Sequence, residues 1–318
     1  MHAIATHHHP VHQNRSTQLL VHAVATHRDP VHQNGGAVRR YPHNRVPTTA
    51  PLAADRPTAA TERSEFGRDG HVCVRALLTP DEVERYRPAV LAAAAEGNRE
   101  TRALEDRDVY GRAFLQCTNL WRLDERVREL VCAPRIARVA AELLGAASVH
   151  LYHDQALLKE AGGGHTPWHQ DQFYWPFPPG PPNTVTAWIP LHDLDPAVGS
   201  MTFASGTHRS GDLSGQPISA ASEAALGDLV EAEGLPTATH GALRAGDATF
   251  HAGWTLHRAG PNPTASVREV MTVIYVAGGT RIAEPANAYQ QFDLAVWLPD
   301  QQPGDEVGGP RNPVLWPG

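Results

Sequence analysis

The sequence predicts one mainly β domain that is braced by helices on its N-terminal side. From about residue 148, the chain contains short stretches of strand-forming residues, each bounded by Gly, Pro, Asn or Asp. The part before them carries helix start and stop signals instead. A chain of 318 residues with 41% hydrophobic content can also bury one sizeable core. We therefore expect a single folded domain over residues 61–318.

Helices and one short strand are expected first. Residues 71–76 fit a strand, and residues 79–82 then supply an N-cap, a proline at the first helical position and a capping-box glutamate. This helix should run to about residue 96 and stop at a glycine. Further helices are expected over residues 124–132 and 134–144. We expect these helices to brace one side of the β domain.

Six segments have the length and the boundaries of strands. They are residues 148–158, 166–173, 184–191, 199–203, 247–251 and 268–276. Residues 210–240 interrupt this series with Ser, Gly and Ala, and they include an expected helix over residues 219–230. Long insertions in compact domains are often lids, so residues 210–240 are a candidate lid. A surface excursion without a function explains the segment equally well.

The first 60 residues differ from the rest. The sequence from His2 to Asn14 recurs with few changes from His22 to Asn34, and residues 50–60 are rich in Pro, Ala and Thr. Two copies are too few for a solenoid, and the segment lacks apolar periodicity. We expect a disordered extension and linker over residues 1–60. A histidine-rich metal-storage arm and sequence upstream of the true start of translation are the alternatives.

Charge and composition argue against several classes of protein. The net charge of -7 disfavours nucleic acid as the main partner, because a phosphate-binding surface needs a basic excess. The sequence shows no apolar run of about 18 residues and no signal-peptide core, so no membrane association is expected. The three cysteines give neither a disulfide framework nor zinc-ribbon spacing. A reduced, cytoplasmic protein is expected, and the sequence leaves its oligomeric state open.

The most informative motif is the triplet His169-Gln170-Asp171, followed at long range by His257 and, eleven residues later, by Arg268. Residues i and i+2 of an extended strand project from one face, so His169 and Asp171 can reach the same ion. Two histidines and one carboxylate occupy one face of an iron(II) ion and leave positions for a 2-oxo acid and dioxygen. Arg268 can pair with the far carboxylate of that acid. Taken alone, the triplet also fits a hydrogen-bonded histidine in an apolar core.

Longer stretches around these residues make the motif specific. They are residues 166–176 (TPWHQDQFYWP), 186–191 (TAWIPL), 199–209 (GSMTFASGTHR) and 246–262 (GDATFHAGWTLHRAGPN). With these stretches the chain resembles the phytanoyl-CoA dioxygenase family from about Phe66 to Tyr275. The resemblance implies a double-stranded β-helix, which is a jelly-roll or cupin-like barrel. It also implies an oxygenase that depends on non-haem iron(II) and 2-oxoglutarate.

The resemblance assigns roles to single residues. The implied iron ligands are His169, Asp171 and His257. Arg268 would bind the C5 carboxylate of 2-oxoglutarate, and Trp188 matches a tryptophan that lines the co-substrate pocket in similar enzymes. Gln116 falls where relatives place a polar contact to the co-substrate. Trp188 and Gln116 are equally compatible with core packing.

Two positions near the distal histidine bear on the implied site. The family often has a serine two residues after this histidine, whereas this chain has Ala259. One hydrogen bond to 2-oxoglutarate is therefore missing or is supplied by another group. His251 also precedes His257, but the distance from His257 to Arg268 fits the family pattern. His251 is expected on the preceding strand.

The surroundings of the motif indicate the kind of substrate. Aromatic residues are dense there: Trp168, Phe173, Tyr174, Trp175, Phe177, Trp188, Phe203 and Trp254. Aromatic residues are common in β cores, but this density favours an apolar, water-poor pocket. Lys159, the only lysine, lies near the mouth of this pocket and could meet an acidic substrate. A solvated charge at a strand end is the simpler interpretation.

These observations predict an enzyme, an Fe(II)- and 2-oxoglutarate-dependent dioxygenase that uses O2. It would hydroxylate an unactivated C–H bond of a mainly apolar small molecule and release succinate and CO2. Asp171 favours hydroxylation over halogenation, because related halogenases replace this carboxylate by a small residue. Desaturation, epoxidation and ring formation stay open, because they differ from hydroxylation only in the fate of the substrate radical. Family analogy suggests bacterial specialised metabolism. A zinc-dependent hydrolase or isomerase and a non-catalytic ligand-binding barrel are the alternatives.

Overall fold

The computed structural model describes Leu52 and residues 56–317. The duplicated histidine-rich sequence and most of the expected linker lie outside these described residues. The first described helix, α2 (Ala60–Asp69), begins where the linker was expected to end. Leu52 is fully buried, and its carbonyl accepts a hydrogen bond from the backbone N–H of Arg135. Contacts of the domain therefore reach back at least to residue 52.

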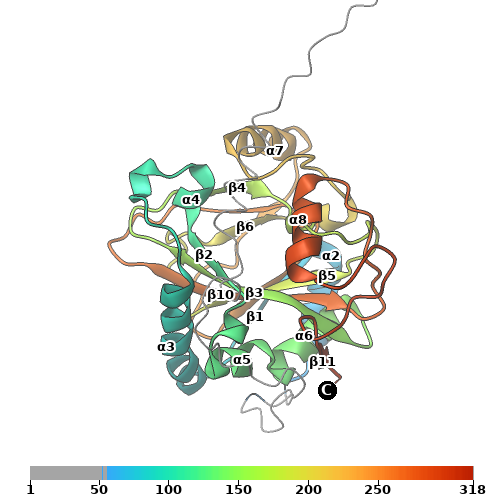
Figure 1. The fold of residues 1–318 in the computed structure, drawn as a ribbon. Coiled ribbons are helices and arrows are strands. Elements are labelled where there is room, and N and C mark those ends of the chain that lie inside the picture. Colours follow the sequence, from blue (N-terminus) through green and yellow to red (C-terminus); the bar gives the residue numbers. More distant parts are fainter. Residues whose placement is uncertain (1–51, 53–55, 318) are drawn as a thin grey trace, which may run out of the picture. The chain divides into compact units, whose positions relative to one another are not determined.

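Two antiparallel sheets form the centre of the domain (Figure 1). The larger sheet has the strand order β1-β8-β5-β10-β3-β11, and β2 also pairs with β3. Its strands are β1 (His71–Val74), β2 (Leu115–Thr118), β3 (Val149–Lys159), β5 (Thr184–Pro190), β8 (Ala248–Ala252), β10 (Arg268–Ala277) and β11 (Val314–Trp316). The smaller sheet, in the order β4-β9-β6-β7, contains β4 (Thr166–His169), β6 (Met201–Ala204), β7 (Thr237–Ala238) and β9 (His257–Ala259). This arrangement confirms the predicted mainly β, jelly-roll fold.

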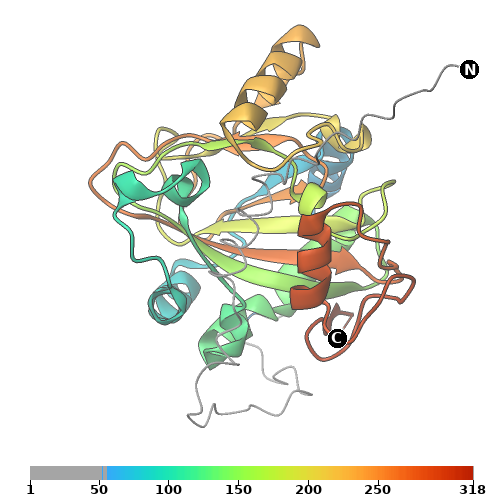
Figure 2. The ribbon, with the colours of Figure 1, turned by 45° about the horizontal axis from the view of Figure 1, so that its top comes forward.

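Helices cover the outer face of the larger sheet. The three expected helices are confirmed as α3 (Pro80–Gly97), α5 (Glu125–Val131) and α6 (Pro134–Leu144), and they share one hydrophobic core with this sheet. The other helices are α4 (Val109–Ala113), α7 (Ala220–Ala232) and α8 (Ala288–Trp297), with 3-10 turns η2 (Leu104–Asp106), η3 (Leu120–Arg122), η4 (Asp171–Tyr174) and η5 (Thr207–Arg209). Figure 2 shows α3 and α5 on one side of the larger sheet and α7 on the other side of the domain. None of the helices in the described part of the chain is long and apolar enough to cross a membrane.

The two faces of the larger sheet differ in chemistry. Alternate residues of a strand point to opposite faces. In β10, Met271 belongs to the core that the sheet shares with the helices. Its neighbour Val270 packs instead with Phe203 of the smaller sheet, and Arg268 lies on the same side as Val270. The face turned toward the smaller sheet therefore carries Arg268, whereas Glu269 on the opposite face pairs with Arg87 of α3.

One expected strand is shorter than the sequence indicated. The strand predicted over residues 166–173 ends at His169, and η4 follows. Gln170 is still extended, with φ −125° and ψ 127°. The N–H of Gln172, however, bonds to the Gly253 carbonyl instead of a ladder partner. This bond replaces the ladder by a turn, so the prediction of a strand up to residue 173 is wrong.

The aromatic residues near the motif do not form one group. Most of them divide among three hydrophobic clusters, which contain Trp175 with Phe177, Trp188 with Phe203, and Trp168 with Leu226 of α7, whereas Phe173 and Trp254 belong to none of these clusters. The expected helix in the inserted segment is confirmed as α7, which packs against β4. The strand that carries His169 is thereby enclosed between the larger sheet and α7.

Candidate metal centre

The predicted triad meets where β4 and β9 lie side by side. His169 ends β4, His257 begins β9, and the two residues are register partners in the smaller sheet. Asp171 follows as the first residue of η4. One possible ligand atom from each of the three residues lies within 4.8 Å of the other two. Among the described residues, this is the one group of His, Cys, Asp and Glu side chains with such a geometry.

Hydrogen bonds orient both imidazoles. The Nδ1 atom of His169 lies 2.7 Å from the Pro167 carbonyl oxygen, and that of His257 lies 2.8 Å from the Thr255 carbonyl oxygen. Because a carbonyl can only accept, each Nδ1 carries the proton and each Nε2 keeps a free lone pair. The two Nε2 atoms lie 3.6 Å and 3.7 Å from Oδ1 of Asp171. These separations are too long for good hydrogen bonds and leave room for an ion between the three atoms.

The second oxygen of Asp171 has other partners. Thr186 of β5 donates its hydroxyl to Oδ2 at 3.1 Å, and Nε2 of His251 lies 3.1 Å from the same oxygen. His251 lies on β8, the strand before β9, as the sequence predicted. It contacts the carboxylate and does not replace His257. Neither contact was predicted, although Thr186 begins one of the stretches that resemble the family.

The protonation states suit a divalent metal. Burial opposes ionisation of Asp171, but the neighbouring imidazoles of His257, His169 and His251 hold the pKa of its carboxyl well below the usual range. Burial, followed by the neighbouring imidazoles, lowers the pKa of His257 well below its ordinary value. Asp171 is then an anion and His257 is neutral at neutral pH. This donor set of two imidazoles and one carboxylate, with oriented rings, fits an Fe(II) ion.

Two buried cations lie on the same face of the larger sheet as the partners of Asp171. Arg268 of β10 and Lys159 of β3 are register partners, with exposed fractions of 1% and 0%. Burial, followed by the charge of Arg268, lowers the pKa of Lys159 to about 7, and burial lowers that of Arg268 to about 9. Neither cation forms an ion pair with a carboxylate of the described residues. The interpretation of Lys159 as a solvated charge is therefore wrong, because the neighbouring loop covers it.

Arg268 is only partly hydrogen-bonded. Its Nη1 donates to the Gly199 carbonyl at 2.8 Å, while its Nε is buried without a partner. Its guanidinium carbon lies 5.3 Å from the centre of the Trp188 ring, so the structure brings two predicted co-substrate residues together. A guanidinium with unused donors can bind a carboxylate.

Both ends of the Gln116 amide are hydrogen-bonded to other side chains. Its Oε1 accepts a hydrogen bond from the Tyr110 hydroxyl at 2.6 Å, and its Nε2 donates to Oε1 of Gln155. Gln116 lies on β2, opposite Leu157 of β3, whereas Tyr110 belongs to α4. Gln116 thus joins a polar network that connects α4 to the larger sheet. Its contact with the co-substrate stays a prediction.

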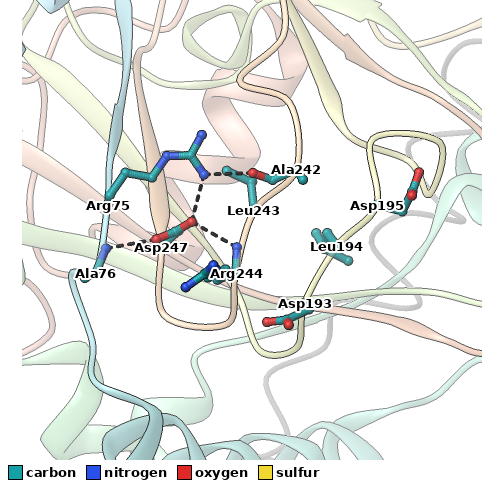
Figure 3. Close-up of a pocket in the computed structure, with 9 residues that line it drawn as sticks. All are labelled: Arg75, Ala76, Asp193, Leu194, Asp195, Ala242, Leu243, Arg244 and Asp247. Atoms are coloured by element: carbon teal, nitrogen blue, oxygen red, sulfur yellow. Dashed lines mark hydrogen bonds and ion pairs between the residues drawn. The ribbon is translucent and has the colours of Figure 1, made fainter.

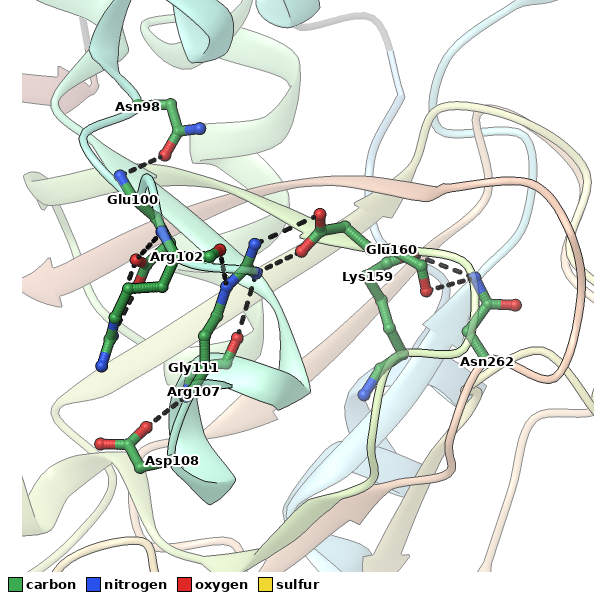
Figure 4. A network of polar contacts seen from close by, with 9 residues as sticks. All are labelled: Asn98, Glu100, Arg102, Arg107, Asp108, Gly111, Lys159, Glu160 and Asn262. Carbon is green, nitrogen blue, oxygen red and sulfur yellow. Dashed lines mark hydrogen bonds and ion pairs between the residues drawn. The ribbon is translucent and has the colours of Figure 1, made fainter. Parts of the chain in front are cut away.

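A second network fixes the strand end that carries Lys159 (Figure 4). The Asn262 amide donates to the carbonyls of Lys159 and Glu160 at 3.0 Å each. The Glu160 carboxylate pairs with Arg107, which precedes α4 and also donates to the Arg102 carbonyl at 3.0 Å. These bonds hold α4 and the end of β3 together.

A pocket of about 580 Å³ lies elsewhere in the domain (Figure 3). Its lining includes Arg75, Asp193, Asp195, Arg244 and Asp247. Arg75 and Asp247 form an ion pair at 2.8 Å, and Figure 3 shows that Asp247 also accepts from the backbone of Ala76. None of the predicted site residues lines this pocket.

Comparisons with known proteins agree with the geometry. The family model described as phytanoyl-CoA dioxygenase matches residues 66–270, which confirms the resemblance found in the sequence. L-proline trans-4-hydroxylase of Streptomyces griseoviridis is 29% identical over 149 residues, covering 46% of this chain and 54% of the relative. Ectoine dioxygenase of Nocardia farcinica is 29% identical over 149 residues, covering 46% of this chain and 50% of the relative. The matched part spans about half the length of these curated relatives.

A solved structure extends the likeness to most of the domain. The epimerase SnoN, in complex with Fe3+, α-ketoglutarate and nogalamycin RO, superposes with a TM-score of 0.65 and 28% identity. The match covers 80% of this chain and 97% of SnoN. SnoN is described as a non-heme α-ketoglutarate-dependent epimerase from nogalamycin biosynthesis, and α-ketoglutarate is 2-oxoglutarate. The relatives thus include an iron- and 2-oxoglutarate-dependent enzyme, as the sequence predicted.

Proposed function

Because the chain belongs to the phytanoyl-CoA dioxygenase family, we propose that it is an Fe(II)- and 2-oxoglutarate-dependent dioxygenase acting on a small molecule. One observation carries the proposal. The triad of His169, Asp171 and His257 lies beside a face that also carries two buried cations without a carboxylate partner among the described residues. No carboxylate of the described residues neutralises the two cations. An anion can therefore bind the metal at one end and the two cations at the other.

The register of the larger sheet links the two parts of this site. Thr186 contacts Asp171, and the ring of Trp188 faces the Arg268 guanidinium. Both residues belong to β5 and are two positions apart, so they share one face of the sheet. A dicarboxylate can then reach from the metal, past Trp188, to Arg268 and Lys159. We assign the C5 carboxylate of 2-oxoglutarate to these two cations.

The family often has a serine hydroxyl where this chain has Ala259. Another group can supply the missing hydrogen bond. Thr166 is the register partner of Ala259, and its hydroxyl lies 3.4 Å from the Lys159 ammonium. We assign the missing hydrogen bond to Thr166 and Lys159. The pair would then compensate for the alanine at this position.

Each protein group has a defined task. The Pro167 and Thr255 carbonyls hold the protons of the two imidazoles away from the metal. Thr186 and His251 keep one Asp171 oxygen occupied. Bound iron would supply the redox chemistry by which R–H, 2-oxoglutarate and O2 give R–OH, succinate and CO2.

We place the substrate beside η4 and α8, where aromatic side chains gather. The rings of Phe173 and Tyr174 in η4 lie 5.9 Å and 5.4 Å from that of Tyr289 in α8. Burial, followed by the charge of Asp171, raises the pKa of Tyr110, so this phenol lies within the field of the ligand carboxylate. These residues support a mainly apolar, ring-bearing small molecule with neutral polar anchors. The SnoN relative supports a place in bacterial specialised metabolism.

Other reactions fit the site less well. A zinc hydrolase or a ligand-binding barrel could use the triad, but neither needs two buried cations for a second carboxylate. Epimerisation has a specific argument, since the SnoN relative is an epimerase. It would use the same metal and co-substrate without adding oxygen to the product, so the second oxygen atom of O2 would leave as water and a two-electron reductant such as ascorbate would have to be added to the assay. The mass of the product separates it from hydroxylation.

The test uses the anaerobically purified full chain with Fe(II), 2-oxoglutarate and a library of small metabolites, to which O2 is then added. Succinate is quantified, and each substrate is examined for a product heavier by one oxygen atom. We expect metabolite-stimulated succinate formation that Asp171→Ala abolishes. Arg268→Ala should raise the KM for 2-oxoglutarate roughly 10- to 100-fold, because a charged hydrogen bond contributes about 1.5–3 kcal/mol.

Four results would contradict the proposal. Metal-independent turnover, or succinate formation that survives in Asp171→Ala, would remove the triad from the chemistry. Tight zinc retention with hydrolysis and no succinate would favour the zinc enzyme. Succinate formation with a product of unchanged mass would support epimerisation.

A further inference from the structure

The residue between the first two ligands has a side chain with unusually complete hydrogen bonding. Gln170 has an exposed fraction of 0%. Its Nε2 donates to the Trp254 carbonyl at 2.6 Å and to the Gly211 carbonyl at 2.9 Å. Its Oε1 accepts from the backbone N–H of Leu213 at 2.7 Å and of Ser214 at 3.2 Å. One amide thus connects three parts of the main chain.

The first connection joins the ligands to one another. Trp254 lies in the turn between β8 and β9, three residues before His257. The N–H of Gln172, on the other side of Asp171, donates to the Gly253 carbonyl of the same turn at 2.9 Å. Gln170 and Gln172 therefore hold the segment of His169 and Asp171 against the turn that delivers the third ligand.

The second connection joins the ligands to the inserted segment. Gly211, Leu213 and Ser214 lie where this segment leaves the smaller sheet, before α7. Two further contacts follow the same path: the N–H of Ile218 donates to the Tyr174 hydroxyl at 2.7 Å, and Glu223 of α7 accepts from the Trp168 N–H at 2.8 Å. The inserted segment is thus bonded directly to the residues that flank the ligands.

We propose that Gln170 is a positioning residue that couples metal binding to the order of residues 211–218. The inference rests on the proposed metal centre. The Gln170 amide is bonded to the turn at Trp254 and also to Gly211, Leu213 and Ser214. A displacement of the segment that carries His169 and Asp171 is therefore transmitted to residues 211–218, and the reverse also holds. Such a coupling is reciprocal: metal binding orders the segment, and an ordered segment tightens metal binding.

A purely structural glutamine would behave differently. It would contribute equally to the stability of the protein with and without metal, and its loss would leave metal affinity unchanged. Loss of a positioning residue must change the metal affinity, the spectrum of the bound metal, or the effect of the metal on residues 211–218. Loss of groups that support metal ligands typically weakens metal binding about 10- to 100-fold.

The experiment uses Co(II) as the probe metal and the full chain. Gln170→Glu keeps the acceptor for Leu213 and Ser214 but removes both donors, and Gln170→Met removes all four bonds. Gln291→Glu, at an exposed glutamine of α8, is the matched control. For each protein we measure Co(II) affinity, the visible absorption of bound Co(II), and chymotryptic cleavage after Leu213 with and without Co(II).

In the wild type, Co(II) should slow cleavage after Leu213. In both Gln170 variants, Co(II) affinity should fall about 10- to 100-fold, the Co(II) spectrum should change, and protection by the metal should be lost. The Gln291→Glu control should match the wild type. The wild-type measurement does not depend on the folding of any variant.

The outcomes separate this inference from the proposed function. If Asp171→Ala still binds Co(II) as tightly as the wild type, the proposed metal centre itself fails. If Asp171→Ala loses Co(II) but Co(II) does not alter cleavage after Leu213, only the coupling is overturned. Unchanged Co(II) affinity and spectrum in a folded Gln170 variant would likewise reduce Gln170 to a structural role.

Discussion

The Asp171 carboxylate uses its two oxygens for different purposes. Oδ1 faces the Nε2 atoms of His169 and His257, while Oδ2 lies 3.1 Å from both Thr186 and His251. Partners on one oxygen fix the rotation of the carboxylate, so the other oxygen would face the proposed metal in one orientation. In the proposed centre His251 therefore supports a ligand without being one.

His251→Leu should weaken metal binding about 10- to 100-fold, because Oδ2 loses one of its two partners and the carboxylate can turn. Anaerobic titration with Co(II) or Fe(II) measures the effect. His165→Leu is a suitable control, since His165 is exposed. An affinity equal to that of the wild type would show that Thr186 alone fixes Asp171.

Lys159 gives the proposed co-substrate site a pH dependence. With a pKa lowered to about 7 by burial and by Arg268, the free protein carries this charge below pH 7 and loses it as the pH rises. Binding of a carboxylate favours the protonated form, so binding above pH 7 takes up a proton. The affinity for 2-oxoglutarate should fall by up to roughly tenfold per pH unit above 7.

Calorimetry of 2-oxoglutarate binding to the Co(II) protein tests this expectation. Two buffers with different ionisation enthalpies reveal the proton uptake, and a series from pH 6.5 to about 8, below the pKa of Arg268, gives the slope. Lys159→Met should bind more weakly below pH 7 and should lose the pH dependence. A flat profile in the wild type would place the carboxylate away from Lys159.

At the scale of elements, α7 holds β4 through one carboxylate. Glu223 accepts the Trp168 N–H at 2.8 Å and pairs with Arg258 at 3.0 Å, and these two residues directly precede His169 and follow His257. The helix thus contacts both of the strands that carry His169 and His257. The candidate lid at residues 210–240 stays a prediction.

Glu223→Gln should loosen α7 from β4, because the ion pair is lost and the hydrogen bond to Trp168 becomes a neutral one. Hydrogen exchange should accelerate in α7 and in β4, while α3 should stay unchanged. Glu231→Gln, on an exposed position of the same helix, is the control. Equal exchange in both variants would show that apolar packing alone holds α7 in place.

Elements with strong local signals could be predicted from the sequence. The helix α3 has a capping threonine, a proline and a capping-box glutamate at its start, and these signals act within a few residues. β9 has only the three residues from His257 to Ala259 and depends on pairing with β4 and β6. No local pattern distinguishes such a strand. The turn at Asp171 escaped prediction for the same reason, because its bond partner, Gly253, is distant in sequence.

At the scale of the molecule, the sequence was enough to single out the triad, whereas the groups that support it could be identified only from the fold. His169, Asp171, His257 and Arg268 were singled out by their separations along the chain together with the longer stretches around them, which resemble the family. The burial of Lys159 depends on the pairing of β3 with β10 and on the loop that follows β3. Long-range pairing of this kind is invisible in a single sequence, so Lys159 was misjudged as solvated.

The N-terminal duplication offers a test of where the functional domain begins. The described contacts start at Leu52, whose carbonyl accepts from the Arg135 N–H at 3.4 Å. A chain lacking residues 1–50 keeps this contact and all residues of the proposed site. We therefore expect the same melting temperature, the same succinate production and the same metal content as in the full chain, measured by calorimetry, chromatography and elemental analysis. Extra Zn(II) or Ni(II) bound by the full chain alone would instead identify the histidine-rich duplication as a metal-storage arm, because imidazole is a common ligand of both ions.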